Sequence, residues 1–269
     1  MPVLVTGAEA GTGRAVVARL LRTGGEVRVY LDPEAAPDAL VERYRRSGVK
    51  VARGSLEDEG RLELALAQVH TVMHTRGGPL DEPAAVLDDV ASVLSAAIGA
   101  GCRRVVWTSQ IGAEAPGSDP YLMACAEAEA LLADAPLETV VVRRAVTYGS
   151  QEPLTALLAA GIDGVDPRAR HAPLYADDLA AALQAADAER GRTEPGHVAV
   201  TLTGPDVVEL SELVEGLRKA GAHRLVPHRP PPPHLAELLS RDALPGPSTL
   251  GRTGTPLAEG LARTRPVGA

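Results

Sequence analysis

The 269-residue chain is 45% hydrophobic and acidic, with 35 Asp and Glu against 27 Lys and Arg, giving a formal net charge of −8. Its length allows one sizeable core, alone or with a smaller appended lobe, and its acidity argues against nucleic acid or an anionic membrane surface as a partner. No segment approaches the roughly 18 unbroken apolar residues of a membrane span, and residues 1–20 carry charges where a signal peptide needs an apolar stretch. Cys102 and Cys125 make no disulfide framework, so we expect a cytoplasmic protein.

The first twenty residues carry the strongest local pattern. A short apolar strand, Val3 to Val5, runs into a turn with glycine at positions 7, 11 and 13, and a helix with apolar residues at helical spacing follows. Glycine allows the tight turn and lets the backbone approach a pyrophosphate, while free N–H groups at the helix N-terminus attract the anion. The turn predicts a dinucleotide site, and a purely structural strand–helix connection is the alternative.

Strand-like runs alternate with amphipathic helices up to about residue 145. Strands are expected near 2–6, 26–31, 49–53, 70–74, 103–108 and 138–143, and helices near 12–23, 35–46, 58–68, 82–100 and 120–134. This alternation predicts an α/β fold, a doubly wound parallel Rossmann sheet with helices on both faces. Right-handed crossovers give the strand order 3-2-1-4-5-6, with the ligand crevice over the ends of strands one, four and five.

The alternation loosens beyond residue 150. Helices near 152–160, 177–188, 209–219 and 233–241, with a strand near 197–202, predict a small C-terminal substrate lobe. Residues 245–269 are rich in Gly, Pro and Thr without apolar periodicity, and this composition predicts an extended or flexible segment. We therefore expect a dinucleotide-binding core over 1–150, the lobe over 151–244 and a tail over 245–269.

Several short motifs follow one another along residues 2–225. They are Thr6-Gly7-x-x-Ala10-x-x-Gly13, Val27 to Pro33, Gly54-Ser55-Leu56-Glu57-Asp58, Val72-Met73-His74-Thr75, Val105-Val106-Trp107-Thr108-Ser109, Arg143-Arg144 with Thr147-Tyr148-Gly149, and Ala176-Asp177-Asp178-Leu179-Ala180. In this order they resemble the motifs of the extended and atypical short-chain dehydrogenases, most closely the NmrA-like, NAD(P)-binding branch. Arg144 stands where that family has proline.

The resemblance implies where NAD or NADP would bind. The implied cofactor residues are Gly7, Ala10, Gly11, Thr12, Gly13, Asp32, Ser55, Leu56, His74, Thr75 and Thr108. Asp32 would hold the ribose 2′-hydroxyl, or it is simply a turn residue before Pro33. NAD is slightly favoured, because the arginine usual at this point in NADP-type members is absent unless Arg14 reaches across.

The family's catalytic acid is the tyrosine of a YxxxK motif, and Tyr121 occupies its place with Cys125 where the lysine belongs. In the family the lysine lowers the tyrosine's pKa and holds the nicotinamide ribose, whereas a tyrosine without a cation titrates near pH 10. Tyr121 and Ser109 are the catalytic candidates. The alternatives are an ordinary tyrosine at a helix start and a serine that ends a strand.

Four residues are candidates for the substrate pocket: Cys125, Thr147, Tyr148 and His171. For Cys125, a small buried hydrophobe is the simpler interpretation. No metal site is expected, because His70 and His74 lie on a predicted strand about 13 Å apart.

These features favour an NAD(P)H-dependent reductase, an oxidoreductase that acts on a small-molecule quinone, enone or ketone, of aromatic or polyketide type as in secondary metabolism. The missing lysine and the alanine in the glycine turn favour an alternative, a non-redox NmrA-like protein. Such a protein would be a nucleotide-sensing regulator, or an auxiliary or cyclase-type factor in natural-product biosynthesis. A cyclase or isomerase that had lost the nucleotide would show side chains blocking the pyrophosphate position.

Overall fold

The computed structural model describes residues 1–188, 196–222, 230–244 and 254–264. Its centre is a seven-stranded parallel sheet in the order β10-β6-β5-β4-β1-β2-β3. The strands are β1 (Val3–Thr6), β2 (Val27–Leu31), β3 (Lys50–Arg53), β4 (Thr71–His74), β5 (Arg104–Gln110), β6 (Glu138–Arg144) and β10 (His197–Leu202). The predicted order 3-2-1-4-5-6 is confirmed, and β10 extends it beside β6.

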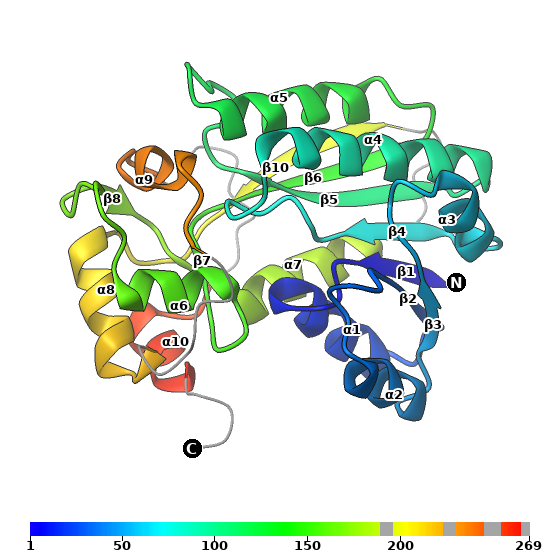
Figure 1. The fold of residues 1–269 in the computed structure, drawn as a ribbon, viewed down its shortest axis with the longest axis horizontal. Coiled ribbons are helices and arrows are strands. Elements are labelled where there is room, and N and C mark those ends of the chain that lie inside the picture. The colour runs from blue at the N-terminus through cyan, green and yellow to red at the C-terminus, as the bar shows by residue number, and fades with distance from the viewer. Residues whose placement is uncertain (189–195, 223–229, 245–253, 265–269) are drawn as a thin grey trace.

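Helices cover both faces of the sheet (Figure 1). One face carries α3 (Glu59–Leu66), α4 (Pro83–Gly99) and α5 (Pro120–Ala133), and the other carries α1 (Gly11–Arg22), α2 (Asp38–Arg46) and α7 (Ala176–Ala188). Neighbouring residues of one strand therefore belong to different cores, as Val105 and Val106 do. Burial on both faces explains why the strands read as continuous apolar runs.

The remaining elements gather beyond the carboxyl ends of the strands, at the left of Figure 1. They are β7 (Thr147–Tyr148), α6 (Pro153–Ala160), β8 (Arg170–His171), β9 (Leu174–Tyr175), β11 (Val208–Glu209), α8 (Leu210–Lys219), α9 (His234–Leu239) and α10 (Leu257–Arg263). Two elements that follow residue 150, α7 and β10, complete the Rossmann layers. The division at residues 150 and 244 stays a prediction. Within the described ranges, no helix is long and apolar enough to cross a membrane.

The expectation of an extended or flexible segment over 245–269 is wrong for residues 257–263, which form α10. Leu257 and Gly260 are its buried residues, and a Cβ on Gly260 would lie only 2.0 Å from the Tyr148 hydroxyl. Thr255 anchors the preceding chain through two hydrogen bonds to the Asp178 carboxylate. So few inward-facing positions leave no apolar period in the sequence. Residues 245–253 and 265–269 lie outside the described residues.

We expect Gly13→Ala to destabilise the fold, because its Cβ would lie 2.2 Å from the Gly7 carbonyl oxygen. Overpacking of this kind costs about 1–3 kcal/mol or more. Gly25→Ala is the control, since no atom lies within 4 Å of a Cβ there. Urea unfolding measures both variants. Equal unfolding midpoints would contradict the close packing of α1 on β1.

Candidate cofactor and catalytic site

The turn between β1 and α1 has the geometry of a phosphate cradle. Gly7 and Gly11 adopt positive φ angles of 77° and 47°, conformations that favour glycine. A Cβ on Gly7 would lie 2.7 Å from Thr75 Oγ1. No side chain caps α1 at Ala10, so the N–H groups of Gly11 and Thr12 are the donors suited to a phosphate. In donors and glycine spacing, the cradle fits a dinucleotide.

The chain itself occupies these donors. Thr12 Oγ1 donates to Glu152 Oε1 at 2.6 Å, and the Thr12 N–H also donates to Glu152. The Gly11 N–H donates to the Gln151 carbonyl at 3.0 Å. A Cβ on Gly11 would lie 2.8 Å from Glu152 Oε1. A carboxylate therefore stands at the predicted pyrophosphate position, the arrangement expected of a blocked crevice.

Glu152 is buried, and burial raises the pKa of its carboxyl while the charge of Arg144 and the hydrogen bonds of Thr12 lower it. Glu152 is also the N-cap residue of α6, yet its side chain makes no cap hydrogen bond there. The carboxylate thus serves the N-terminus of α1 and not that of its own helix.

Charged side chains also surround Asp32, the residue after β2 that is predicted to hold the cofactor's ribose; we call this region the ribose corner. Arg76 Nη1 lies 3.7 Å from Asp32 Oδ2, and Arg76 Nε lies 3.1 Å from Asp89 Oδ2. Glu9 Oε1 accepts the Asp32 N–H at 2.7 Å. Burial raises the pKa of Glu9, and it raises that of Asp89 to about 6. An arginine therefore reaches this corner from the β4–α4 loop, whereas Arg14 does not pair with Asp32.

The other predicted cofactor residues differ in exposure. Ser55 is exposed and Leu56 is buried in the core. His74 Nδ1 lies 2.7 Å from Thr6 Oγ1, and burial lowers the pKa of His74 to about 3, so its ring is neutral. Thr108 is fully buried, and its hydroxyl has no partner among the described residues. Neither His74 nor Thr108 is open to solvent.

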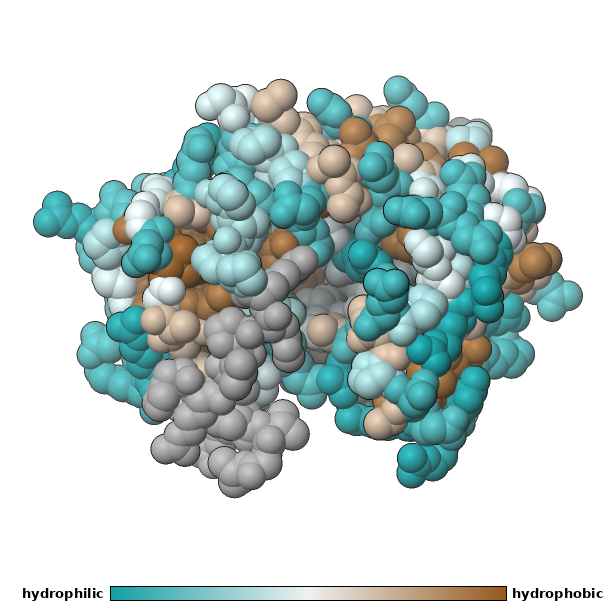
Figure 2. All heavy atoms as spheres, viewed as in Figure 1, coloured by the Kyte–Doolittle hydropathy of each residue, from teal (hydrophilic) through white to brown (hydrophobic). Residues whose placement is uncertain are grey.

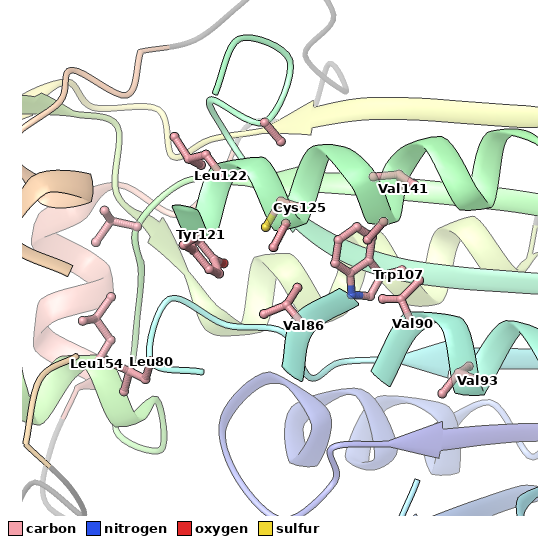
Figure 3. Close-up of a cluster of buried hydrophobic side chains, with 14 of the residues drawn as sticks. Leu80, Val86, Val90, Val93, Trp107, Tyr121, Leu122, Cys125, Val141 and Leu154 are labelled. Atoms are coloured by element: carbon pink, nitrogen blue, oxygen red, sulfur yellow. The ribbon is translucent and has the colours of Figure 1, made fainter. Parts of the chain in front are cut away.

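Tyr121 lies at the start of α5 and is completely buried. Its hydroxyl donates to the Gly77 carbonyl at 3.1 Å, and its ring stacks on His234 with centroids 5.3 Å apart. Burial, helped by Cys125, raises the pKa of Tyr121 well above its ordinary value, although the Arg144 charge lowers it. Figure 3 shows Tyr121 and Cys125 together in the apolar cluster around α5. The phenol is therefore neutral and has no access to solvent.

Ser109 is also fully buried, at the end of β5. Its hydroxyl donates to Glu129 Oε1 at 2.6 Å. Arg143 grips the same carboxylate, with Nε 3.0 Å and Nη2 2.5 Å from Glu129 Oε2. Ser109 therefore belongs to an internal ion-pair network.

The four predicted pocket residues are all buried. Burial raises the pKa of the Cys125 thiol to about 12, and Thr147 Oγ1 donates to the Ala145 carbonyl at 3.0 Å. Tyr148 packs on α10, and His171 Nε2 lies 2.9 Å from the Leu239 carbonyl.

A cavity of about 370 Å³ lies beside α1, and both Gly11 of the cradle and Glu152 line it. Arg14 and Leu21 of α1, Tyr44 of α2 and residues 149–152 line it. Figure 2 shows the molecule hollowed between α6 and the α1–α2 layer.

The sequence did not single out Glu152, Arg76 or Glu129 as site residues. No local pattern marks them, because each meets its partners through the tertiary fold. Arg144 did carry a signal, as the departure from the family's proline.

Comparison with known proteins agrees with the Rossmann-like fold and with the family resemblance. A family model described as NAD(P)H-binding matches residues 7–186. The fold is similar to UDP-glucose 4-epimerase of Thermotoga maritima with UDP-glucose (TM-score 0.73, 21% identity, covering 98% of this chain and 97% of that one). It is also similar to WbmH of Bordetella bronchiseptica with NAD⁺ (0.71, 19%, 98% and 96%) and to the Thermus thermophilus UDP-glucose 4-epimerase with NAD (0.70, 21%, 98% and 97%). No curated protein sequence matches.

We expect neither cysteine to react quickly with a thiol reagent at pH 8 in the native protein. Burial raises the pKa of Cys102 to about 11 and that of Cys125 to about 12, so the thiolate is scarce and shielded. A colorimetric thiol titration should count two thiols only after unfolding. Rapid native reaction at Cys125 would instead indicate an accessible pocket.

Proposed function

The chain belongs to the NAD(P)H-binding family, and from this premise we propose that it binds NAD(P) without transferring hydride, as a nucleotide-responsive, non-redox protein. The observation that carries the proposal is the sealed Tyr121, bonded to the Gly77 carbonyl beside Cys125. A general acid works best when its pKa lies near the working pH. The environment of Tyr121 moves its pKa the opposite way.

A bound dinucleotide would supply a nicotinamide able to carry hydride. Gly11 and Thr12 would hold its phosphates, and Asp32 would hold the adenosine ribose. Beside the nicotinamide, this chain offers no free proton donor at the two predicted catalytic positions, since the hydroxyls of Tyr121 and Ser109 are both engaged within the protein.

A second candidate is the predicted reductase of a quinone, enone or ketone. The glycine cradle favours it, because the cradle is suited to bind the cofactor. The missing acid counts little against it, since a hydride acceptor of this kind needs little help from an acid. The likeness to UDP-glucose 4-epimerases adds a nucleotide sugar to the ligands to be tried. The NmrA-like branch, the secondary-metabolite substrate and the cytoplasmic location stay predictions.

Calorimetric titration with NADH and NADPH, paired with a spectrophotometric assay of hydride consumption, tests the proposal. We expect binding, but no NAD(P)H oxidation with a panel of quinones, enones and ketones, and no epimerisation of UDP-glucose. Cys125→Lys should create no turnover, because it places an ammonium in an apolar cluster and leaves Tyr121 bonded to Gly77.

The contrary result is acceptor-dependent NADH oxidation that Tyr121→Phe lowers by about a hundredfold, the contribution of a positioned acid. Tyr30→Phe controls for stability, since Tyr30 is also buried and donates to a backbone carbonyl at 3.1 Å. If neither NADH nor NADPH binds, the proposal is also contradicted.

A further inference from the structure

Glu152 presents to α1 the chemistry that a nucleotide phosphate would present. An anionic oxygen accepts both the N–H and the hydroxyl of Thr12, at the positive end of the helix dipole. The neighbouring Gly11 N–H is satisfied by the Gln151 carbonyl. Because a carboxylate and a phosphate cannot share these donors, one excludes the other.

We propose that Glu152 is a built-in occupant of the phosphate cradle, and that a dinucleotide binds by displacing its carboxylate from Thr12 toward Arg144. This inference rests on the proposed function and adds that the Glu152 carboxylate competes with the nucleotide's phosphates. The class of ligand is a nucleotide carrying a pyrophosphate.

Arg144 is a suitable second partner for the displaced carboxylate. Its side chain is buried at 6% exposure, and its Nε has no hydrogen-bond partner among the described residues. A buried N–H group of this kind lacks compensation for its lost hydration. Arg144 lies against Gly78, where a Cβ would be 2.9 Å from its Nη2, and its charge lowers the pKa of Glu152. The two charges are therefore within electrostatic reach but unpaired.

The segment that carries Glu152 can transmit its displacement. Gly149 donates through its N–H to Thr155 Oγ1 of α6 at 3.0 Å, and Ser150 Oγ donates to the Arg263 carbonyl of α10 at 3.4 Å. Tyr148, just before this segment, packs against Gly260 of α10. Loss of the Glu152 contact would therefore loosen the docking of α6 and α10, which gives a nucleotide-responsive protein a structural output.

Four variants, compared with wild type, separate the parts of this proposal; the fourth, Arg144→Gln, removes the second partner. Glu152→Ala removes the occupant, and Glu152→Gln keeps an acceptor oxygen without its charge. Gln151→Ala is the matched control, because Gln151 contributes its backbone carbonyl and its side chain is exposed. Each protein is titrated calorimetrically with NADH, NADPH and inorganic pyrophosphate, and its amide hydrogen exchange is measured without ligand.

We expect Glu152→Ala to bind the nucleotides and pyrophosphate about tenfold more tightly than wild type, with Glu152→Gln in between and Gln151→Ala unchanged. Without ligand, Glu152→Ala should lose exchange protection at Thr12. Arg144→Gln should weaken nucleotide binding severalfold while protection at Thr12 stays as in wild type, because it removes only the second partner. Thermal unfolding of each variant shows whether it remains folded.

Two outcomes overturn the proposal. One is unchanged affinity together with unchanged protection in Glu152→Ala, and the other is lost protection without any gain in affinity. Nucleotide binding by Glu152→Ala but not by wild type would uphold the occupant and overturn the proposed function. The two ideas can thus fail separately.

Discussion

The hydrogen bond between Thr12 and Glu152 joins positions 140 residues apart, and the arrangement of the ligand crevice depends on it. It joins the loop before α6 to the first helix and places a carboxylate in the phosphate cradle. The bond also leaves Arg144 without its most natural partner, since the carboxylate faces α1 instead. One contact thus sets both the occupancy of the crevice and its unbalanced charge.

A second constraint acts at the catalytic end. Position 125, where the family resemblance implies a lysine, is a cysteine, and Tyr121 is buried under His234 with its hydroxyl bonded to the Gly77 carbonyl. Ser109 is committed to Glu129. The two parts of the site therefore differ: the cradle keeps its donors and holds a carboxylate on them, whereas Tyr121 and Ser109 are part of the core.

The sequence predicted the fold, but it did not mark several residues that shape the candidate site, for physical reasons. Hydrophobic period and glycine placement are local, so the strand order and the cradle followed from them. The sequence did not predict α10, because Leu257 and Gly260 are the buried residues of that helix and two positions give no apolar period. The sequence did not mark Glu152 and Arg76 as site residues, because their contacts are with residues that only the tertiary fold brings near. Tyr121 and Ser109 were placed on the right elements, but burial cannot be read from a motif.

A crystal structure of the protein grown with NADH tests the central claim most directly. We predict a dinucleotide phosphate on the N–H groups of Gly11 and Thr12, with the Gln151 carbonyl moved off Gly11 and the Glu152 carboxylate moved off Thr12 and paired with Arg144. A dinucleotide bound in the crevice while Glu152 still accepts the hydrogen bonds of Thr12 would contradict it.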